Sequence, residues 1–179
     1  MRYGCYMDSP VGRLQLVEKD GALTHVLFCS RREPKSPTEE GHEVLAKVAG
    51  KTVYFKEECT PLLKKVQAEL REYFEGKRQS FDIPLAPEGT AFQLKAWNGL
   101  RTIPYGETRT YKQMAEYAQC PQGYRAIGMA NNRNPISIIV PCHRVIGSNG
   151  KLVGFGGGLD KKALLLDLEK KAMEESSAE

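Results

Sequence analysis

The hydrophobic pattern changes its period at residues 84–90, a connector with two prolines and a glycine, and this change constrains the fold most. Before the connector, short stretches alternate polar and apolar residues, as strands do. After it, apolar residues recur three and four positions apart, as in amphipathic helices. A chain of 179 residues is long enough for two small domains. We therefore expect an α/β domain over residues 1–87 and a mainly helical domain over residues 88–179.

The first domain should begin with strands. The alternating stretches lie within residues 3–29, and Asp20-Gly21 between two of them is a strong hairpin signal. Residues 31–42 are charged and contain two prolines and a glycine, so a loop is expected there.

A helix should follow these strands. Thr60 and Pro61 are typical of a helix N-terminus, because a threonine side chain accepts a backbone hydrogen bond and proline fits the first turn. Apolar residues at helical spacing continue through Tyr73, and Gly76 is expected to end the helix. Residues 81–83 are predicted to form a short strand.

The second domain reads as a series of short helices. They are expected at residues 92–100, 110–118 and 124–131, with a last helix capped by Asp160. Residues 136–140 are apolar and predict a short buried strand or extended run. The tail from Glu174 is expected to fray.

Composition and cysteine spacing exclude several classes of protein. The longest apolar run, residues 136–140, is far shorter than the roughly 20 residues of a membrane span. The first residues lack the apolar core of a signal peptide, so we expect a cytoplasmic protein, or a nuclear one in a eukaryote. The five cysteines are scattered and form no CxxC pair, which disfavours a disulfide framework or a zinc ribbon.

The basic charge is concentrated in one part of the chain. Residues 1–88 hold equal numbers of basic and acidic side chains, whereas residues 89–159 hold eight basic and two acidic ones. Such an excess is compatible with a polyanionic partner such as DNA. It is equally compatible with a basic surface that serves only solubility.

Two of the expected helices flank a tight turn at Gly123, the usual form of a helix-turn-helix. Arg125 lies in the first turn of the second helix and is followed by the small residues Ala126 and Gly128. Small side chains would let this helix backbone approach a DNA groove closely. The alternative is that they permit close packing between helices inside the domain.

The most reactive group of residues is Pro141-Cys142-His143-Arg144. A cysteine beside a base or a positive charge can become a nucleophile. The alternative is a buried structural cysteine, since neighbouring side chains usually point apart. Upstream, Asn134 precedes a proline and could tie a turn through its amide, or could simply occupy a plain turn.

These residues, taken together, closely resemble the O6-alkylguanine-DNA alkyltransferases. The resemblance is strongest in Asn134-Pro-Ile-Ser-Ile-Ile-Val-Pro-Cys-His-Arg-Val-Ile146. It extends to Tyr105-Gly-Glu-Thr-Arg-Thr-Tyr111, Arg125-Ala-Ile-Gly128, Gly157-Gly-Leu-Asp-Lys-Lys162 and Leu168-Glu169. It covers roughly residues 88–170 and, more loosely, the N-terminal hairpin. It implies a ribonuclease-H-like N-terminal domain and a C-terminal domain with a winged helix-turn-helix.

The resemblance implies a protein that repairs DNA once and is consumed. An alkylated guanine would be flipped out of the duplex, and the Cys142 thiolate, with a depressed pKa, would take the alkyl group irreversibly. O4-alkylthymine is a second expected substrate. His143 would act through a water as the base, with Glu169 as its orienter.

Further residues carry roles only by this resemblance. Tyr111 would protonate the leaving guanine, Asn134 would hold the active-site turn, and Lys162 would lie near the nucleophile. The residues expected to contact DNA are Tyr111, Arg125, Ala126, Gly128 and Arg133. The residues expected around the guanine are Met129, Val145, Phe155 and Gly156.

The expected partner is double-stranded DNA with an alkylated guanine, bound by a monomer without a cofactor. No metal is expected, because Cys5 and His25 are too few to form a ligand set. Two other functions stay open: an alkyltransferase-like protein that binds the lesion without transfer, and a winged-helix transcription regulator with a buried cysteine. Glu169 could also be a surface residue paired with Lys170 or Lys171.

Overall fold

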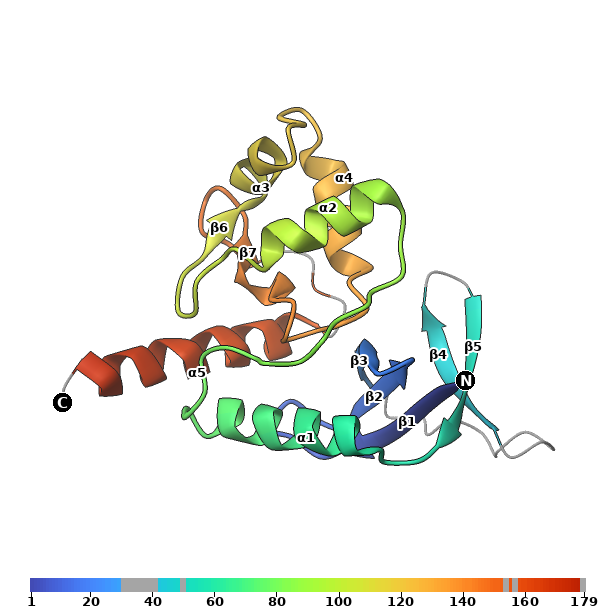
Figure 1. The fold of residues 1–179 in the computed structure, drawn as a ribbon. Helices are drawn as coiled ribbons and strands as arrows, with labels where there is room; N and C mark the ends of the chain where they lie inside the picture. The colour runs from blue at the N-terminus through green and yellow to red at the C-terminus, as the bar shows by residue number, and fades with distance from the viewer. Residues whose placement is uncertain (30–41, 49–50, 153–154, 156–157, 178–179) are drawn as a thin grey trace.

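The computed structural model describes residues 1–29, 42–48, 51–152, 155 and 158–177. A sheet with one helix beneath it forms the N-terminal unit, and a cluster of short helices forms the C-terminal unit (Figure 1). The last helix runs between the two units. No helix within the described ranges is long and apolar enough to cross a membrane.

The N-terminal unit is built on a five-stranded sheet with the order β3-β2-β1-β5-β4. Its strands are β1 (Arg2–Met7), β2 (Leu14–Lys19), β3 (Ala22–Phe28), β4 (His42–Val48) and β5 (Lys51–Glu57). Neighbouring strands are antiparallel, except that β1 and β5 are parallel. The expected hairpin is confirmed: Asp20 and Gly21 join β2 to β3 with φ values of 53° and 79°.

Two expectations for this unit differ from the structure. Strands β4 and β5 were not predicted, and most of the expected loop, residues 30–41, lies outside the described residues. The predicted strand at residues 81–83 is wrong, since only Leu85 forms an isolated bridge, to Leu23. Pro84 and Pro87 lack the N–H groups that a longer ladder needs.

Helix α1 (Pro61–Phe74) forms as its sequence predicts. The Thr60 side chain accepts a hydrogen bond from the Leu63 N–H at 3.2 Å, and Pro61 opens the first turn. The helix lies against β1, β2 and β3 and buries Leu63, Val66, Leu70 and Tyr73. Tyr73 is in its last turn, beside α5, which brings this end of the helix to the C-terminal unit.

The C-terminal unit confirms the predicted helices. They are α2 (Ala91–Leu100), α3 (Tyr111–Tyr117), α4 (Tyr124–Asn132) and α5 (Leu159–Ser177). Two short strands, β6 (Arg109–Thr110) and β7 (Val145–Ile146), pair in parallel, and a 3-10 turn, η1 (Cys142–Arg144), precedes β7. Capping boxes at Thr90 and Thr110 fix the starts of α2 and α3.

Residues 134–141 are a buried turn rather than the expected strand. Only Ile136 forms a bridge, to Val26 on the edge strand β3. Ile138 has a φ of 72°, a left-handed conformation that β-branched residues rarely adopt. The beginning of the turn is held on both sides of Ile136, because Val26 N donates to Pro135 O and Ser137 N donates to Val26 O. The N-terminal sheet thus supports the segment that leads to Cys142.

Helix α5 differs from expectation at both ends. It begins at Leu159, so Asp160 lies in its first turn instead of capping it, and it continues to Ser177, past the expected fraying at Glu174. Its buried residues, Lys162, Leu165, Glu169 and Ala172, follow a three-and-four spacing that defines one face. Two charged side chains therefore point into the protein.

Candidate active site

The Cys142 thiol lies at the start of η1 and is 5% exposed. The turn before it is tied by Asn134, whose Nδ2 donates to Val140 O at 2.8 Å and whose Oδ1 accepts from Ile136 N at 3.0 Å. These two bonds hold the backbone on both sides of the left-handed Ile138. The position of the thiol is therefore set by the backbone of the turn and by the Asn134 amide.

The pKa of the Cys142 thiol is raised, and burial is the main cause. A hydrogen bond from Asn134 and the positive charge of Lys162 lower it but do not outweigh burial. The prediction that the pKa of Cys142 is depressed is therefore wrong for the protein without DNA. The resting residue is a thiol, and a base must remove its proton before it can act as a nucleophile.

His143, the residue directly after Cys142, is completely buried. Its Nε2 lies 2.5 Å from Glu169 Oε2. Burial alone would raise the pKa of Glu169, but the bonds and charges of His143 and Arg144 lower it to about 2. The carboxylate is ionised and can only accept, so His143 donates from Nε2 and its Nδ1 has a free lone pair. Nδ1 is buried and lacks a hydrogen-bond partner within the described part of the chain.

The pKa of His143 is lowered, first because of burial, while Glu169 acts in the opposite direction. The imidazole is therefore neutral near pH 7 and able to accept a proton. The 2.5 Å contact brings His143 and Glu169 together, as the family resemblance implies. Glu169 is 1% exposed, which excludes the alternative of a surface residue paired with Lys170 or Lys171.

Glu169 is also held by groups that the sequence argument did not include. Arg144 donates from Nε to Oε1 at 2.8 Å and from its terminal nitrogen to Oε2 at 3.2 Å. The Tyr73 hydroxyl donates to Oε2 at 2.6 Å, and Gly106 N donates to Oε1 at 3.2 Å. Arg144 had been counted as surface charge, although it belongs to the quoted motif. Tyr73 had been assigned to the apolar face of its helix.

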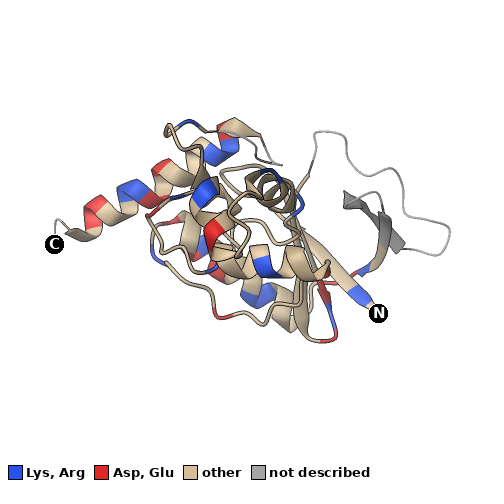
Figure 2. Ribbon diagram, turned by 90° about the horizontal axis from the view of Figure 1, so that it is seen from above, with Lys and Arg blue, Asp and Glu red and all other residues tan. Residues whose placement is uncertain are grey.

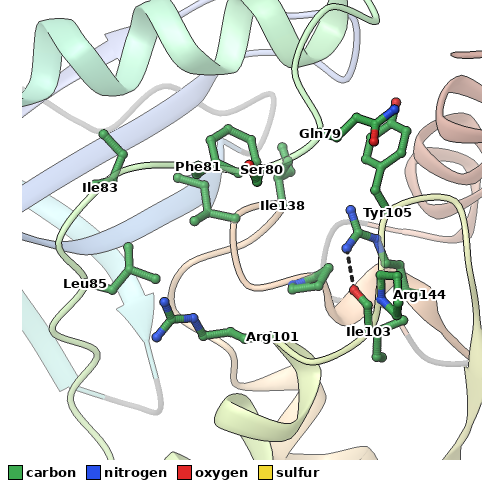
Figure 3. A pocket seen from close by; sticks show the side chains of 13 residues that line it. Gln79, Ser80, Phe81, Ile83, Leu85, Arg101, Ile103, Tyr105, Ile138 and Arg144 are labelled. Atoms are coloured by element: carbon green, nitrogen blue, oxygen red, sulfur yellow. Dashed lines mark hydrogen bonds between the residues drawn. The ribbon is translucent and has the colours of Figure 1, made fainter. Parts of the chain in front are cut away.

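Arg144 is fixed on its other side by the C-terminal unit. It donates to the Ile103 carbonyl at 2.8 Å (Figure 3). The cavity beside it has a volume of about 260 Å³ and lies between residues 79–85 and this unit. Cys142, Tyr111 and Val145 do not line that cavity, so it is not the expected guanine pocket.

Tyr111 and Lys162 both lie close enough to Cys142 for its charge to affect them. The parallel pairing of β6 with β7 sets Arg109 beside Val145 and Thr110 beside Ile146, so Tyr111 begins α3 next to the chain that follows η1. Burial and the charge of Cys142 raise the pKa of Tyr111. The Nζ of Lys162 lies 5.8 Å from the centre of the Tyr111 ring. Burial lowers the pKa of Lys162, while Cys142 opposes that effect.

The outer face of α4 carries the residues expected to contact DNA. Arg125, Ala126 and Arg133 are exposed there. Gly128 is half-buried, and a Cβ on it would lie 3.9 Å from the Tyr111 ring. Met129 was expected beside the guanine, but it is 57% exposed and shares this outer face. Met129 lies one helix turn after Arg125, so it shares a face with a residue expected to contact DNA and not with the expected guanine pocket.

The remaining pocket residues are placed only in part. Val145 is completely buried directly after η1. Phe155 is half-buried and packs edge-on against Phe28 of the N-terminal sheet, with ring centres 5.6 Å apart. Gly156 lies outside the described residues.

The basic excess of the C-terminal unit is mostly on its surface. Of the eight basic side chains between residues 89 and 159, six are exposed: Lys95, Arg101, Lys112, Arg125, Arg133 and Lys151. Figure 2 shows that basic and acidic residues alternate along α5. That helix therefore does not add a surface of uniform positive charge. The positive potential belongs to the unit with α3 and α4.

Known proteins share both the sequence and this architecture. A family model of the 6-O-methylguanine DNA methyltransferase DNA binding domain matches residues 91–171, and one of its ribonuclease-like domain matches residues 1–87. The chain belongs to the 6-O-methylguanine DNA methyltransferase family. A methylated-DNA–protein-cysteine methyltransferase of Methanosarcina barkeri is 45% identical over 92% of this chain and 94% of its own length.

Solved structures of 6-O-methylguanine DNA methyltransferases agree with this membership. The O6-methylguanine methyltransferase of Mycobacterium tuberculosis is 38% identical, with a TM-score of 0.79 over 96% of this chain and 94% of its own. The OGT of the same organism in complex with DNA is 39% identical, with a TM-score of 0.78 over 95% and 94%. The resemblance stated from the sequence is therefore confirmed, and so is a two-unit fold with an α/β sheet followed by helices.

Proposed function

We propose that the protein repairs O6-alkylguanine in DNA by moving the alkyl group to the Sγ atom of its own Cys142, in one irreversible turnover. Family membership makes it a methylated-DNA–protein-cysteine methyltransferase that binds DNA. The observation that supports Cys142 as the acceptor is that its buried thiol is followed directly by the neutral, buried His143. Alkyltransferase-like proteins, which bind the lesion without transfer, lack this cysteine. The family assignment excludes the third possibility, a winged-helix transcription regulator.

The transfer begins with a proton leaving the thiol. The Cys142 proton passes through a water to Nδ1 of His143, and Glu169 stabilises the imidazolium that forms. Since the thiol rests protonated, this step creates the nucleophile only when the base is in place. The positive charge of Lys162 stabilises the thiolate during the reaction.

The thiolate sulfur then forms a bond to the alkyl carbon in line with the leaving oxygen. The carbon–O6 bond breaks and its electron pair stays on the guanine, which takes a proton at N3 from Tyr111. Neither the sulfur nor the carbon passes through a tetrahedral oxyanion, so no oxyanion hole is needed. The thioether product is stable, and each molecule therefore acts once.

DNA engagement follows from the outer face of α4. The helices α3 and α4 act as the helix-turn-helix, of the winged type, on a ribonuclease-H-like N-terminal support. The small Ala126 and Gly128 let α4 approach the minor groove, and Arg125 fills the stack left by the flipped base. The protein acts as a monomer on double-stranded DNA, in the cytoplasm or, in a eukaryote, the nucleus.

Mass spectrometry tests the function directly. After incubation with duplex DNA that contains O6-methylguanine, the intact protein should gain the mass of one methyl group, and peptide mapping should place it on Cys142. The gain should saturate at one group per molecule, because no step regenerates the thiol. A protein that binds the lesion DNA but gains no mass would be a lesion-binding protein instead.

Base flipping predicts a substrate-dependent effect of Arg125→Ala. The variant should react with free O6-benzylguanine at the normal rate but with duplex DNA about tenfold more slowly, because only the duplex requires a flipped base. The matched control, Arg101→Ala, removes the same charge from an exposed position on another helix end. Single-turnover rates on both substrates measure this difference. Equal losses of rate on both substrates would show that Arg125 does not act in base flipping.

A further inference from the structure

One hydrogen bond to the reaction centre comes from the N-terminal unit. The Tyr73 hydroxyl, in the last turn of α1, donates to Glu169 Oε2 at 2.6 Å. The same carboxylate oxygen accepts from Nε2 of His143. Tyr73 and Glu169 are 96 positions apart in the chain and are both buried. The proton-accepting pair is therefore in direct contact with a residue of the other unit.

We propose that Tyr73 is a positioning residue for the alkyl transfer. Its hydroxyl holds Glu169 Oε2 and reduces the negative charge that this oxygen presents to His143, so that His143 rests as a neutral base. This inference rests on the roles proposed above for His143 and Glu169. It assigns the N-terminal unit a part in the chemistry, in addition to supporting the active-site turn through β3.

The Tyr73 hydroxyl reduces the charge on Glu169 because it stays protonated and donates. Burial and the neighbouring Glu169 carboxylate raise the pKa of Tyr73 well above its ordinary value, so the phenol is protonated near pH 7. A hydrogen-bond donor stabilises the negative charge of the carboxylate. The carboxylate then attracts a second donor, here the His143 ring, less strongly. The charged or titratable groups that face the His143–Glu169 pair are Tyr73, Tyr105, Cys142, Arg144 and Lys162.

Packing alone does not require this hydroxyl. The Tyr73 ring contacts Phe74, Phe81 and Tyr105 with centre distances of 5.4, 5.7 and 6.1 Å, and a phenylalanine ring would keep those contacts. Glu169 would also keep its bonds to Arg144 and Gly106. The Tyr73→Phe variant should therefore fold and lose only the hydrogen bond to Glu169. Tyr105→Phe is the matched control, since its buried hydroxyl has no hydrogen-bond partner among the residues described.

The test is a pair of pH titrations on the full chain. The first follows the His143 ring by NMR, assigned with His143→Gln among three histidines. The second measures single-turnover rates with O6-benzylguanine, which requires no DNA. In Tyr73→Phe the His143 pKa and the acidic limb of the rate profile should both move up by about half a unit or more, because Glu169 then attracts the proton more strongly. Neither should move in Tyr105→Phe.

A second measurement strengthens the tyrosine donors instead of removing one. Wild-type protein made with 3-fluorotyrosine has more acidic phenols, which donate more strongly, so its His143 pKa should move down, and Tyr73→Phe should abolish that movement. An unchanged His143 pKa in Tyr73→Phe, or the same shift in Tyr105→Phe, would overturn the inference. Failure of the proposed function would show differently: the wild type itself would gain no alkyl group on Cys142.

Discussion

Cys142→Ala is expected to abolish alkyl transfer completely, because the thiol is the acceptor and no other group can replace it. Rates should fall below detection, at least about 10⁴-fold for loss of a covalent nucleophile. Affinity for duplex DNA should change little, since the Cys142 side chain is 5% exposed and carries no positive charge for a phosphate. Alkyl incorporation and gel-shift affinity, measured on the same preparation, separate the two effects.

The control for this substitution is Cys29→Ala. Cys29 follows β3 in the N-terminal unit and is half-buried, so it tests whether a more accessible thiol accepts the alkyl group. It should leave transfer unchanged. If Cys142→Ala still gained one alkyl group per molecule, the nucleophile would be a different cysteine, and the roles of His143 and Glu169 would have to be reassigned.

The helices and the first hairpin could be predicted because their signals are local. Thr60, Thr90 and Thr110 each cap a helix through a residue three positions later, and Asp20-Gly21 adopts the turn conformation that its composition indicates. Strand β5 had a usable signal as well, since β-branched and aromatic residues cluster at 52–55 between charges. The prediction for residues 136–140 was wrong because their conformation depends on tertiary hydrogen bonds to Val26, in addition to the local bond from Asn134 to Val140.

The chemistry of the site was predictable only where it lies within one motif. Cys142 and His143 are adjacent in the sequence, and the family resemblance added Glu169. Tyr73 could not be found this way, because an aromatic residue at helical spacing predicts a core position and says nothing of a hydrogen bond to a residue 96 positions away. The pKa of Cys142 was predicted in the wrong direction for a related reason. Burial depends on the whole fold, and it outweighs the neighbouring charges.

Glu169→Gln is expected to have the largest effect on stability. The substitution leaves the Arg144 guanidinium buried without a counter-charge. The new amide also places an N–H group opposite at least one donor, such as the Tyr73 hydroxyl, that now bonds to the carboxylate. Breaking a buried ion pair from one side costs about 3–5 kcal/mol. Urea unfolding at pH 7 measures the loss. Glu175→Gln, an exposed position on the same helix, is the control and should cost about 0.5 kcal/mol or less.

Acid titration gives an independent measure of the same interaction. The pKa of Glu169 is lowered from 4.5 to about 2 in the folded protein, so its contribution is complete above about pH 4.5 and is lost as the pH falls toward 2. This lowering of the Glu169 pKa corresponds to about 3 kcal/mol of the free energy of unfolding. The wild type should therefore lose stability over that range, and Glu169→Gln should lack this part of the loss. Identical acid dependence in both proteins would mean that the carboxylate is not held as the structure shows.

Stability and chemistry can be separated by a double substitution. Replacing the ion pair with Arg144→Met and Glu169→Gln together removes the unpaired buried charge, so much of the lost stability should return. Transfer should stay about 10²-fold slower at pH 7, because the imidazolium on His143 still lacks its carboxylate. The remaining rate should rise toward higher pH as Cys142 loses its proton directly to solvent. If the double variant recovered transfer together with stability, Glu169 would act on the fold alone.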